Sequence, residues 1–138
     1  MENCLFCKIV QGEIKGDIIY EDEKAMALLD INPRAPGHAF VIPKKHFENL
    51  LEVPDGELGG IFLAVKNTAE KLKEKMKADA LSIGINNGRV SGQEIDHLHI
   101  HIMPRFKGDG GNSCQSIVAN IPSAEEREKI RGILKMIN

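Results

Sequence analysis

The sequence predicts one α+β domain over residues 1–138, with an antiparallel sheet of about five strands, one long helix and a C-terminal helix. Three observations predict this class. Several short apolar segments have the length and composition of strands and are mostly joined by turns, which favours an antiparallel sheet over a doubly wound parallel one. One central segment carries apolar residues at helical spacing. A second helical segment follows the last predicted strand.

The first third of the chain is predicted to hold three strands after a short helical turn. Its proline and glycine residues mark the loop, and Pro43 ends the third strand. The predicted elements are a helical turn over 4–10, strands over 17–21 and 24–29, a loop over 32–37 and a strand over 38–42.

The long helix is predicted over residues 55–77, because its apolar residues form one stripe along a helical surface. The members of the stripe are Leu58, Ile61, Phe62, Val65, Ala69, Leu72 and Met76. A strand over 81–85 then ends in the turn 86–88, and a strand over 97–103 is stopped by Pro104. A closing helix is predicted over 123–136, where Ser123 and Glu126 form a capping-box pattern.

Composition excludes several classes of function. The chain has 138 residues and a net charge of −2, so it lacks the basic excess typical of proteins that bind nucleic acid. No apolar run approaches the ~20 residues that span a bilayer. The N-terminus has no secretory pattern, and three cysteines do not suit a secreted disulfide framework. We therefore expect a cytoplasmic protein that binds neither nucleic acid nor membrane, with Cys114 as a free thiol.

Three histidines alternate with apolar residues in the segment from His97 to Met103. On a strand, alternate side chains point to opposite faces, so His97, His99 and His101 share one face while the apolar residues enter the core. An imidazole can act as a nucleophile, a general acid or base, or a metal ligand near neutral pH. The chain contains only five histidines, so this spacing is not expected by chance.

Strand geometry argues against a single metal site made of all three histidines, although neighbouring members of the row could share an ion. A strand rises ~3.3 Å per residue, so His97 and His101 lie about 13 Å apart at the backbone. Zinc holds imidazole nitrogens at ~2.0–2.1 Å, so one ion does not easily reach all three rings. We therefore expect the members of the row to have different tasks.

The alternating motif resembles the signature of the histidine-triad (HIT) family, and the resemblance extends over nearly the whole chain. It is most similar to bacterial-type members, which are related to nucleoside phosphoramidate hydrolases. The other matching segments, read directly from the sequence, are 29–33, 36–38, 41–46, 85–88, 92–94 and 103–105.

The resemblance implies a HIT-like fold and assigns roles to three histidines. His99 matches the nucleophile that takes the nucleotidyl group. His101 matches a neighbour that contacts the phosphate and assists proton transfer, and His38 matches a fourth active-site histidine behind the nucleophile.

The same resemblance assigns the residues that would bind a purine nucleotide. Asp30 matches the carboxylate that binds the ribose hydroxyls, and Gly92, Asn86 and Gln93 lie near the phosphate. A turn cap is the alternative role for Asp30, and a turn residue for Asn86. The slot for the base matches five apolar residues whose alternative role is plain core: Phe6, Ile9, Leu28, Ile31 and Phe40.

Cys4 and Cys7 form a C-x-x-C pair, which alone indicates a redox pair, two buried thiols or a metal site. A thioredoxin-like pair is expected in a βαβ pattern, which the sequence lacks. In many bacterial HIT proteins this pair joins two histidines around zinc. The matching residues here are His46 and His97, so the resemblance implies a structural zinc ion held by Cys4, Cys7, His46 and His97.

The sequence departs from the family pattern near the leaving group. Glu94 stands where the animal phosphoramidate hydrolases have serine, and Asp96 stands where many bacterial relatives have proline. The chain also has no tryptophan, whereas the animal enzymes carry one in a short tail. The leaving group is therefore not defined by the resemblance.

The sequence as a whole predicts a nucleotide hydrolase or nucleotidyl transferase of phosphoramidase type. It would cleave the α-phosphate bond of conjugates such as adenosine 5′-phosphoramidate through a nucleotidyl-histidine. The alternatives are a dinucleoside polyphosphate hydrolase and a nucleotide-binding regulator with little turnover. Relatives of this size are homodimers, so the resemblance also implies a homodimer.

Overall fold

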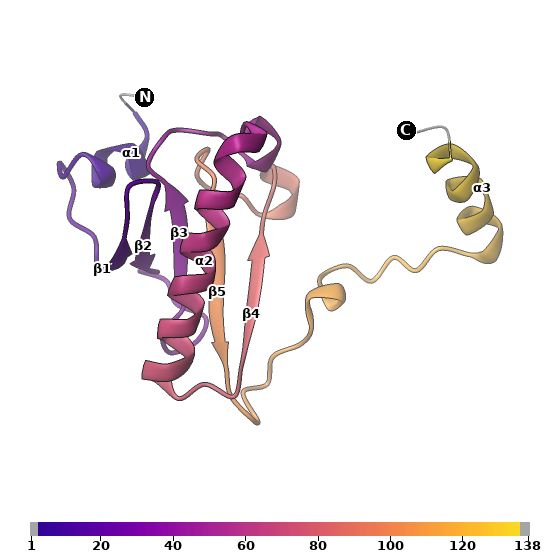
Figure 1. The fold of residues 1–138 in the computed structure, drawn as a ribbon. Coiled ribbons are helices and arrows are strands. Elements are labelled where there is room, and N and C mark those ends of the chain that lie inside the picture. Colours follow the sequence, from indigo (N-terminus) through magenta and orange to yellow (C-terminus); the bar gives the residue numbers. More distant parts are fainter. Residues whose placement is uncertain (1–2, 136–138) are drawn as a thin grey trace.

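The computed structural model describes residues 3–135 and confirms the predicted α+β class. Its five-stranded antiparallel sheet has the order β1-β2-β3-β5-β4, as Figure 1 shows. The strands are β1 (Ile18–Glu21), β2 (Ala25–Leu29), β3 (Ala39–Pro43), β4 (Ala80–Ile85) and β5 (Ile100–Arg105). The α-helices are α1 (Leu5–Val10), α2 (Asp55–Met76) and α3 (Ala124–Leu134).

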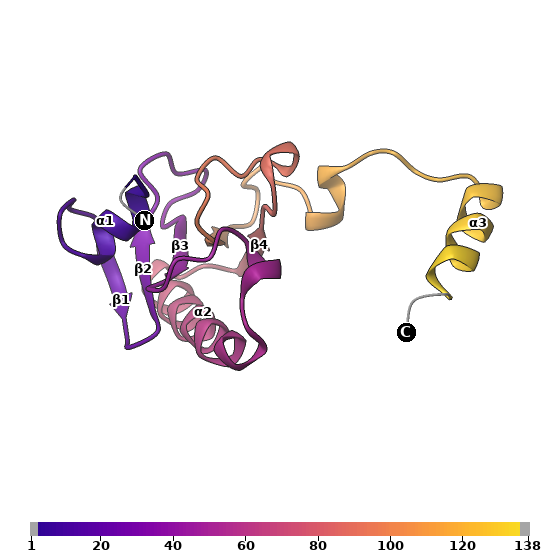
Figure 2. The ribbon, with the colours of Figure 1, turned by 90° about the horizontal axis from the view of Figure 1, so that it is seen from above.

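Helix α2 lies across one face of the sheet, and its ends follow from local sequence (Figures 1 and 2). Asp55 and Glu57 lie in its first turn, and Lys73 and Lys75 lie in its last, so both ends carry charges that suit the helix dipole. Lys77 adopts a left-handed conformation with φ of 54° and ends the helix.

The main core lies between α2 and the sheet. Alternate residues of the central strands enter it, among them Ala39 and Val41 of β3, and Ile100 and Ile102 of β5. Ile61, Val65 and Leu72 of α2 cover them.

The opposite face of the sheet carries a second, smaller cluster under α1. Phe6 of α1 packs there against the other set of alternate strand residues, which are Met26, Leu28, Phe40 and Ile42. Because Ile100 and Ile102 point toward α2, His99 and His101 lie on this second face. The predicted division of the histidine segment into an apolar face and an imidazole face is therefore confirmed.

The predicted bounds of the last strand were wrong at both ends. Its pairing with β3 and β4 begins at Ile100, because the preceding backbone turns away: Leu98 N–H donates to the carbonyl of Phe47. The strand then continues through Pro104, which has a partner only in β4. A residue without a backbone N–H is tolerated where a strand is paired on one side only.

Two further predictions need correction. Phe62 was placed on the buried stripe of the long helix, but 41% of its surface is exposed. The predicted closing helix forms as α3 with the expected capping box at Ser123 and Glu126, and residue 136 of the predicted range lies outside the described residues. However, α3 does not pack against the sheet: every residue of α3 is exposed, and Figure 1 shows the helix well apart from the sheet.

Within residues 3–135, none of the helices has the length and apolar character needed to cross a membrane.

Candidate active site and metal site

Three imidazoles form a row on the face of the sheet that carries α1. The ring centroids of His99 and His101 are 5.1 Å apart. Phe6 of α1 presents its ring at 5.7 Å from His97 and 5.2 Å from His99, in edge-on contacts. Phe40 of β3 lies 5.9 Å from His99. Two aromatic rings therefore hold the middle histidine, which is 9% exposed.

The proton of His99 is placed by a backbone carbonyl. Its Nδ1 lies 2.8 Å from the carbonyl oxygen of His97, and a carbonyl only accepts, so Nδ1 carries the hydrogen. In the neutral ring, Nε2 then keeps a free lone pair. Among the described residues Nε2 has no hydrogen-bond partner. This is the tautomer that a nucleophilic imidazole needs.

His38 and His101 form a second ordered pair. The backbone N–H of Arg34 donates to Nδ1 of His38 at 3.0 Å, so the neutral ring of His38 carries its proton on Nε2. That Nε2 lies 3.0 Å from Nδ1 of His101 and donates to it. The proton of neutral His101 is therefore on its own Nε2, from which it can reach a ligand.

Burial keeps this pair uncharged. It lowers the pKa of His101 to about 4, with smaller contributions from His99 and His38, while Asp30 opposes the shift. Burial also lowers the pKa of His38, again against the Asp30 carboxylate. Both rings are therefore neutral at pH 7, and the Nε2–H of His101 can donate a hydrogen bond to a ligand.

Asp30 contacts both the turn and the histidine pair. Its Oδ1 accepts from the backbone N–H of Asn32 at 2.8 Å, which is the turn-capping role considered from the sequence. Its Oδ2 lies 3.5 Å from Nε2 of His38 and 3.9 Å from Nδ1 of His101. The carboxylate is therefore held in place at the edge of the site.

The structure brings together Cys4, Cys7, His46 and His97 from three segments of the chain, and their ligand atoms lie within 4.8 Å of one another. Nδ1 of His97 is 3.3 Å from Cys4 Sγ and 3.6 Å from Cys7 Sγ, and Nδ1 of His46 is 3.4 Å from Cys7 Sγ. A tetrahedral zinc ion with ordinary bond lengths places its sulfur and nitrogen ligands about 3.6 Å apart. The four side chains therefore fit such an ion.

The surroundings of the four side chains also suit a metal. Nε2 of His97 donates to the carbonyl oxygen of Pro43 at 2.9 Å, which leaves the Nδ1 lone pair facing the thiols. Burial lowers the pKa of His97 to about 4 and raises the pKa of the Cys7 thiol, which its contacts with Cys4 raise further. Neutral imidazole is the form that binds metal, and a cation among the thiols favours their ionised form.

A second cluster, made of Asp30, His38 and His101, is compact enough for an ion, but the tautomer of His38 does not suit metal binding. Because the backbone N–H of Arg34 donates to Nδ1 of His38, the proton on Nε2 leaves no lone pair toward the cluster. This cluster is a hydrogen-bonded pair with a nearby carboxylate, whereas the cysteine-containing cluster presents free lone pairs.

The loop after β4 holds the residues predicted near the phosphate. Gly92 has a φ of 106°, which a residue with a side chain rarely adopts. Gln93 is buried, and its amide donates to the carbonyls of Glu48 and Ile95 at 2.7 and 3.0 Å. Its Oε1 accepts from Gly88 N–H at 2.8 Å. The side chain of Gln93 therefore links the loop segments of Glu48, Gly88 and Ile95, and both N–H groups of its amide are used in doing so. Asn86 is half-buried next to Gly92.

The apolar residues predicted to line a base slot do not share one environment. Phe6, Leu28 and Phe40 are buried together, and Ile9 packs against them while partly exposed. Ile31 lies apart from them, with 86% of its surface exposed.

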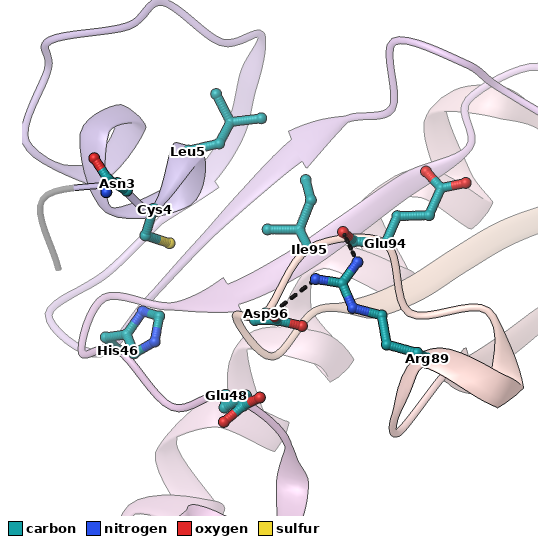
Figure 3. A pocket seen from close by; sticks show the side chains of 9 residues that line it. All are labelled: Asn3, Cys4, Leu5, His46, Glu48, Arg89, Glu94, Ile95 and Asp96. Carbon is teal, nitrogen blue, oxygen red and sulfur yellow. Dashed lines mark hydrogen bonds and ion pairs between the residues drawn. The ribbon is translucent and has the colours of Figure 1, made fainter.

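A cavity of about 660 Å³, whose lining includes Cys4 and His46, borders the cysteine-containing cluster (Figure 3). Arg89 pairs with Asp96 there at 2.8 Å and donates to the backbone carbonyl of Glu94 at the same distance. Figure 3 shows the Glu94 carboxylate pointing away from Asp96 and His46. Of the two acidic residues that depart from the family pattern, Asp96 is therefore paired with Arg89 and Glu94 points away from Asp96 and His46.

The sequence led us to expect a backbone carbonyl as the acceptor that fixes the tautomer of His99, but it did not identify which groups set each tautomer. They are the carbonyls of Pro43 and His97 and the N–H of Arg34. All three are backbone atoms, so residue identity carries no signal for them. Sequence reasoning also missed Arg89, for which the nearby Asp96 was the available signal.

The fold and the site together define a small α+β protein that presents a row of imidazoles beside a cluster of two thiols and two imidazoles. A model of the HIT domain matches residues 11–108, and the chain belongs to the HIT family.

Relatives from three groups of organisms support this membership. An uncharacterised HIT-like protein of Methanocaldococcus jannaschii is 49% identical over 129 residues, covering 94% of this chain and 99% of that protein. The adenosine 5′-monophosphoramidase of Saccharomyces cerevisiae is 39% identical over 102 residues, covering 74% of this chain and 62% of the enzyme. A crystal structure from Streptococcus mutans superposes with a TM-score of 0.87 at 36% identity, covering 100% of this chain and 87% of that one.

Proposed function

We propose that this protein hydrolyses nucleotide conjugates at the α-phosphate, with adenosine 5′-phosphoramidate as the model substrate and His99 as the nucleophile. The observation that carries the proposal is the orientation of His99, whose Nδ1–H is bound by the His97 carbonyl while Nε2 stays free. The similarity to the yeast monophosphoramidase supports the substrate class.

In the proposed first step, Nε2 of His99 forms a bond to the α-phosphorus as the bond to the leaving group breaks. The leaving group departs with the bonding electron pair and takes up a proton from solvent water, while the Nε2–H of His101 donates a hydrogen bond to the phosphate. The backbone N–H of Glu94 would stabilise the charge on the phosphate oxygens, since the N–H groups of Ser91, Gly92 and Gln93 already donate within their loop.

In the second step, water attacks the phosphorus, releases a proton to solvent and regenerates His99, so that the nucleotide leaves as the monophosphate. Asp30 lies beside the His38–His101 pair at the place where the ribose hydroxyls are expected. A carboxylate, which only accepts hydrogen bonds, suits two hydroxyl donors.

The test of this function compares three ligands with the purified protein: adenosine 5′-phosphoramidate, a diadenosine polyphosphate and AMP. We expect AMP to be released from the phosphoramidate with the highest kcat/KM. Faster turnover of the diadenosine compound would instead identify a dinucleoside polyphosphate hydrolase. Binding of AMP without turnover of either conjugate would identify a nucleotide-binding regulator.

We further propose that Cys4, Cys7, His46 and His97 hold one structural zinc ion. Two thiolates and two imidazoles make a closed tetrahedral set, which leaves no open position for a reacting water. When bound, the ion would act as a cross-link between α1, the segment after β3 and the start of the histidine row. The spacing of the sulfur and nitrogen atoms and the free Nδ1 of His97 support this proposal.

A homodimer is also proposed, with a groove between α2 and the edge strand β4 as the contact. Phe62 and Ile83 are 41% and 42% exposed there, beside Val65, Ala69 and Leu81. The groove also has Lys66, Glu70 and Lys73 in its lining, so an antiparallel second copy could pair opposite charges. An edge strand with apolar side chains is suited to pairing with another chain.

Sedimentation at micromolar concentration should give twice the chain mass of 15.2 kDa. Ile83→Glu should shift the protein toward monomer, because it would bury a charge in the contact. Leu51→Glu is the matched control, since Leu51 is 84% exposed and lies outside the groove. A wild-type protein that sediments as one 15.2 kDa species contradicts the dimer.

A further inference from the structure

We infer that the cluster of Cys4, Cys7, His46 and His97, below called the metal cluster, positions the nucleophile when it binds an ion, so that metal occupancy controls kcat. His97 and Phe6 are the positioning residues. The inference rests on the proposed function and on the proposed metal site, and concerns how the two are joined. Two separate paths of contact connect them, one through the backbone and one through an aromatic ring.

The first path passes through His97. Its side chain points Nδ1 at Cys4 and Cys7, and its Nε2 is tied to the Pro43 carbonyl. Its own carbonyl oxygen accepts the Nδ1–H of His99 at 2.8 Å. His97 lies before the first ladder pair of β5, at Ile100, so sheet pairing does not hold this carbonyl. Its direction is set by the side-chain ties of His97 and by the Leu98 N–H of the same peptide unit, which donates at 2.7 Å to the carbonyl of Phe47, the residue after the ligand His46.

The second path passes through α1. This helix has only six residues, and Cys4 caps it by accepting from the N–H of Cys7 at 3.4 Å. Isolated helices of this length are not stable in water, so its position depends on tertiary ties. Phe6 lies between the two cysteines in sequence and places its ring 5.2 Å from His99. A metal bound by both thiols would therefore also fix the ring that packs against the nucleophile.

Loss of the metal should act on both paths at once. Four ligand atoms that are within 4.8 Å of one another would lose their common cross-link, and α1 would move with Phe6. If the His97 carbonyl turns, His99 loses the acceptor that selects its tautomer and its proton is shared between Nδ1 and Nε2. A protonated Nε2 has no lone pair to attack phosphorus, and small displacements of a nucleophile are costly to rate.

The first measurement is the tautomer of His99 by ¹⁵N–¹H NMR of the imidazole rings, in zinc-loaded and chelated full-length protein. We expect one Nδ1–H form with zinc and a mixture of both forms without it. The second is kinetics at a temperature at which circular dichroism shows the chelated protein folded. We expect kcat on adenosine 5′-phosphoramidate to fall at least about tenfold, with KM changed by less than about threefold.

Phe6→Leu tests the second path in zinc-loaded protein. Because this variant needs no chelator, it also keeps the inference testable if chelation unfolds the chain. It keeps the four ligands and removes the ring edge, so we expect a full equivalent of zinc, a lower kcat and a more mobile His99 ring. Cys114→Ser is the matched control, because Cys114 is exposed and outside the cluster; its zinc content, tautomer and kcat should equal those of wild type.

Three results would overturn the inference: a protein that takes up no metal, a chelated folded protein whose His99 keeps the single Nδ1–H form, or a Phe6→Leu protein with unchanged kcat. Absence of turnover in every form would contradict the proposed function instead. In that case the tautomer measurement still decides whether the metal cluster positions His99.

Discussion

His99→Ala should lower kcat on adenosine 5′-phosphoramidate by at least ~10³-fold while nucleotide affinity stays within about tenfold. The bond from Nε2 to phosphorus exists only after the substrate is bound, so its loss affects the reaction and not ground-state binding. A 10³-fold loss corresponds to about 4 kcal/mol of transition-state stabilisation. Steady-state kinetics and equilibrium binding of AMP to the same preparation measure the two quantities.

His38→Ala is the comparison variant and should cost less than His99→Ala. His38 reaches the reaction only through its 3.0 Å hydrogen bond to His101, and forms no bond to phosphorus. Added imidazole should partly restore turnover to His99→Gly, because the small molecule can occupy the vacated space and supply a free ring nitrogen.

Acid-quenched mass spectrometry identifies the covalent residue directly. With a slow phosphoramidate substrate, the nucleotidyl adduct should be found on His99. An adduct on His97 or His101, or near-normal turnover by His99→Ala, would show that the roles along the row are assigned incorrectly.

Removal of zinc should lower the thermal stability of the protein more than any of the substitutions proposed above. Carefully purified protein should contain about one equivalent of zinc, and chelation should lower its Tm markedly. Zinc binding in small peptides contributes ~10–16 kcal/mol of apparent free energy, and a much smaller share would still hold the six-residue helix α1. Differential scanning calorimetry with and without chelator measures the change.

Cys7→Ala separates loss of the ion from other effects of the chelator. This variant should melt below the zinc-loaded wild type and should lose less Tm than wild type on chelation, because its site is already broken. Cys114→Ala should behave like wild type throughout. Metal analysis that finds less than a tenth of an equivalent of zinc would refute the metal site.

Local pattern was sufficient to predict most of the fold. Strand alternation placed Ile100 and Ile102 in the core and His101 on the other face, which the structure confirms. The capping box at Ser123 and Glu126 was readable because it involves side chains three residues apart. The docking of α3 was not readable, since a helical pattern shows that a helix can form and not what it packs against.

The sequence by itself determined which side chains are available for chemistry: five histidines, a C-x-x-C pair and a carboxylate at Asp30, in an order that resembles one family. Only the tertiary structure decided how they divide. The sheet order places β5 beside β3, which brings His38 to His101 and His46 to His97.

Backbone groups from other parts of the chain then select each tautomer. Pro43 O leaves His97 with a lone pair for metal, His97 O leaves His99 with one for phosphorus, and Arg34 N–H leaves His38 with a proton to donate. Every residue carries the same peptide group, so its direction depends on the folded path of the chain and is not encoded in any single residue.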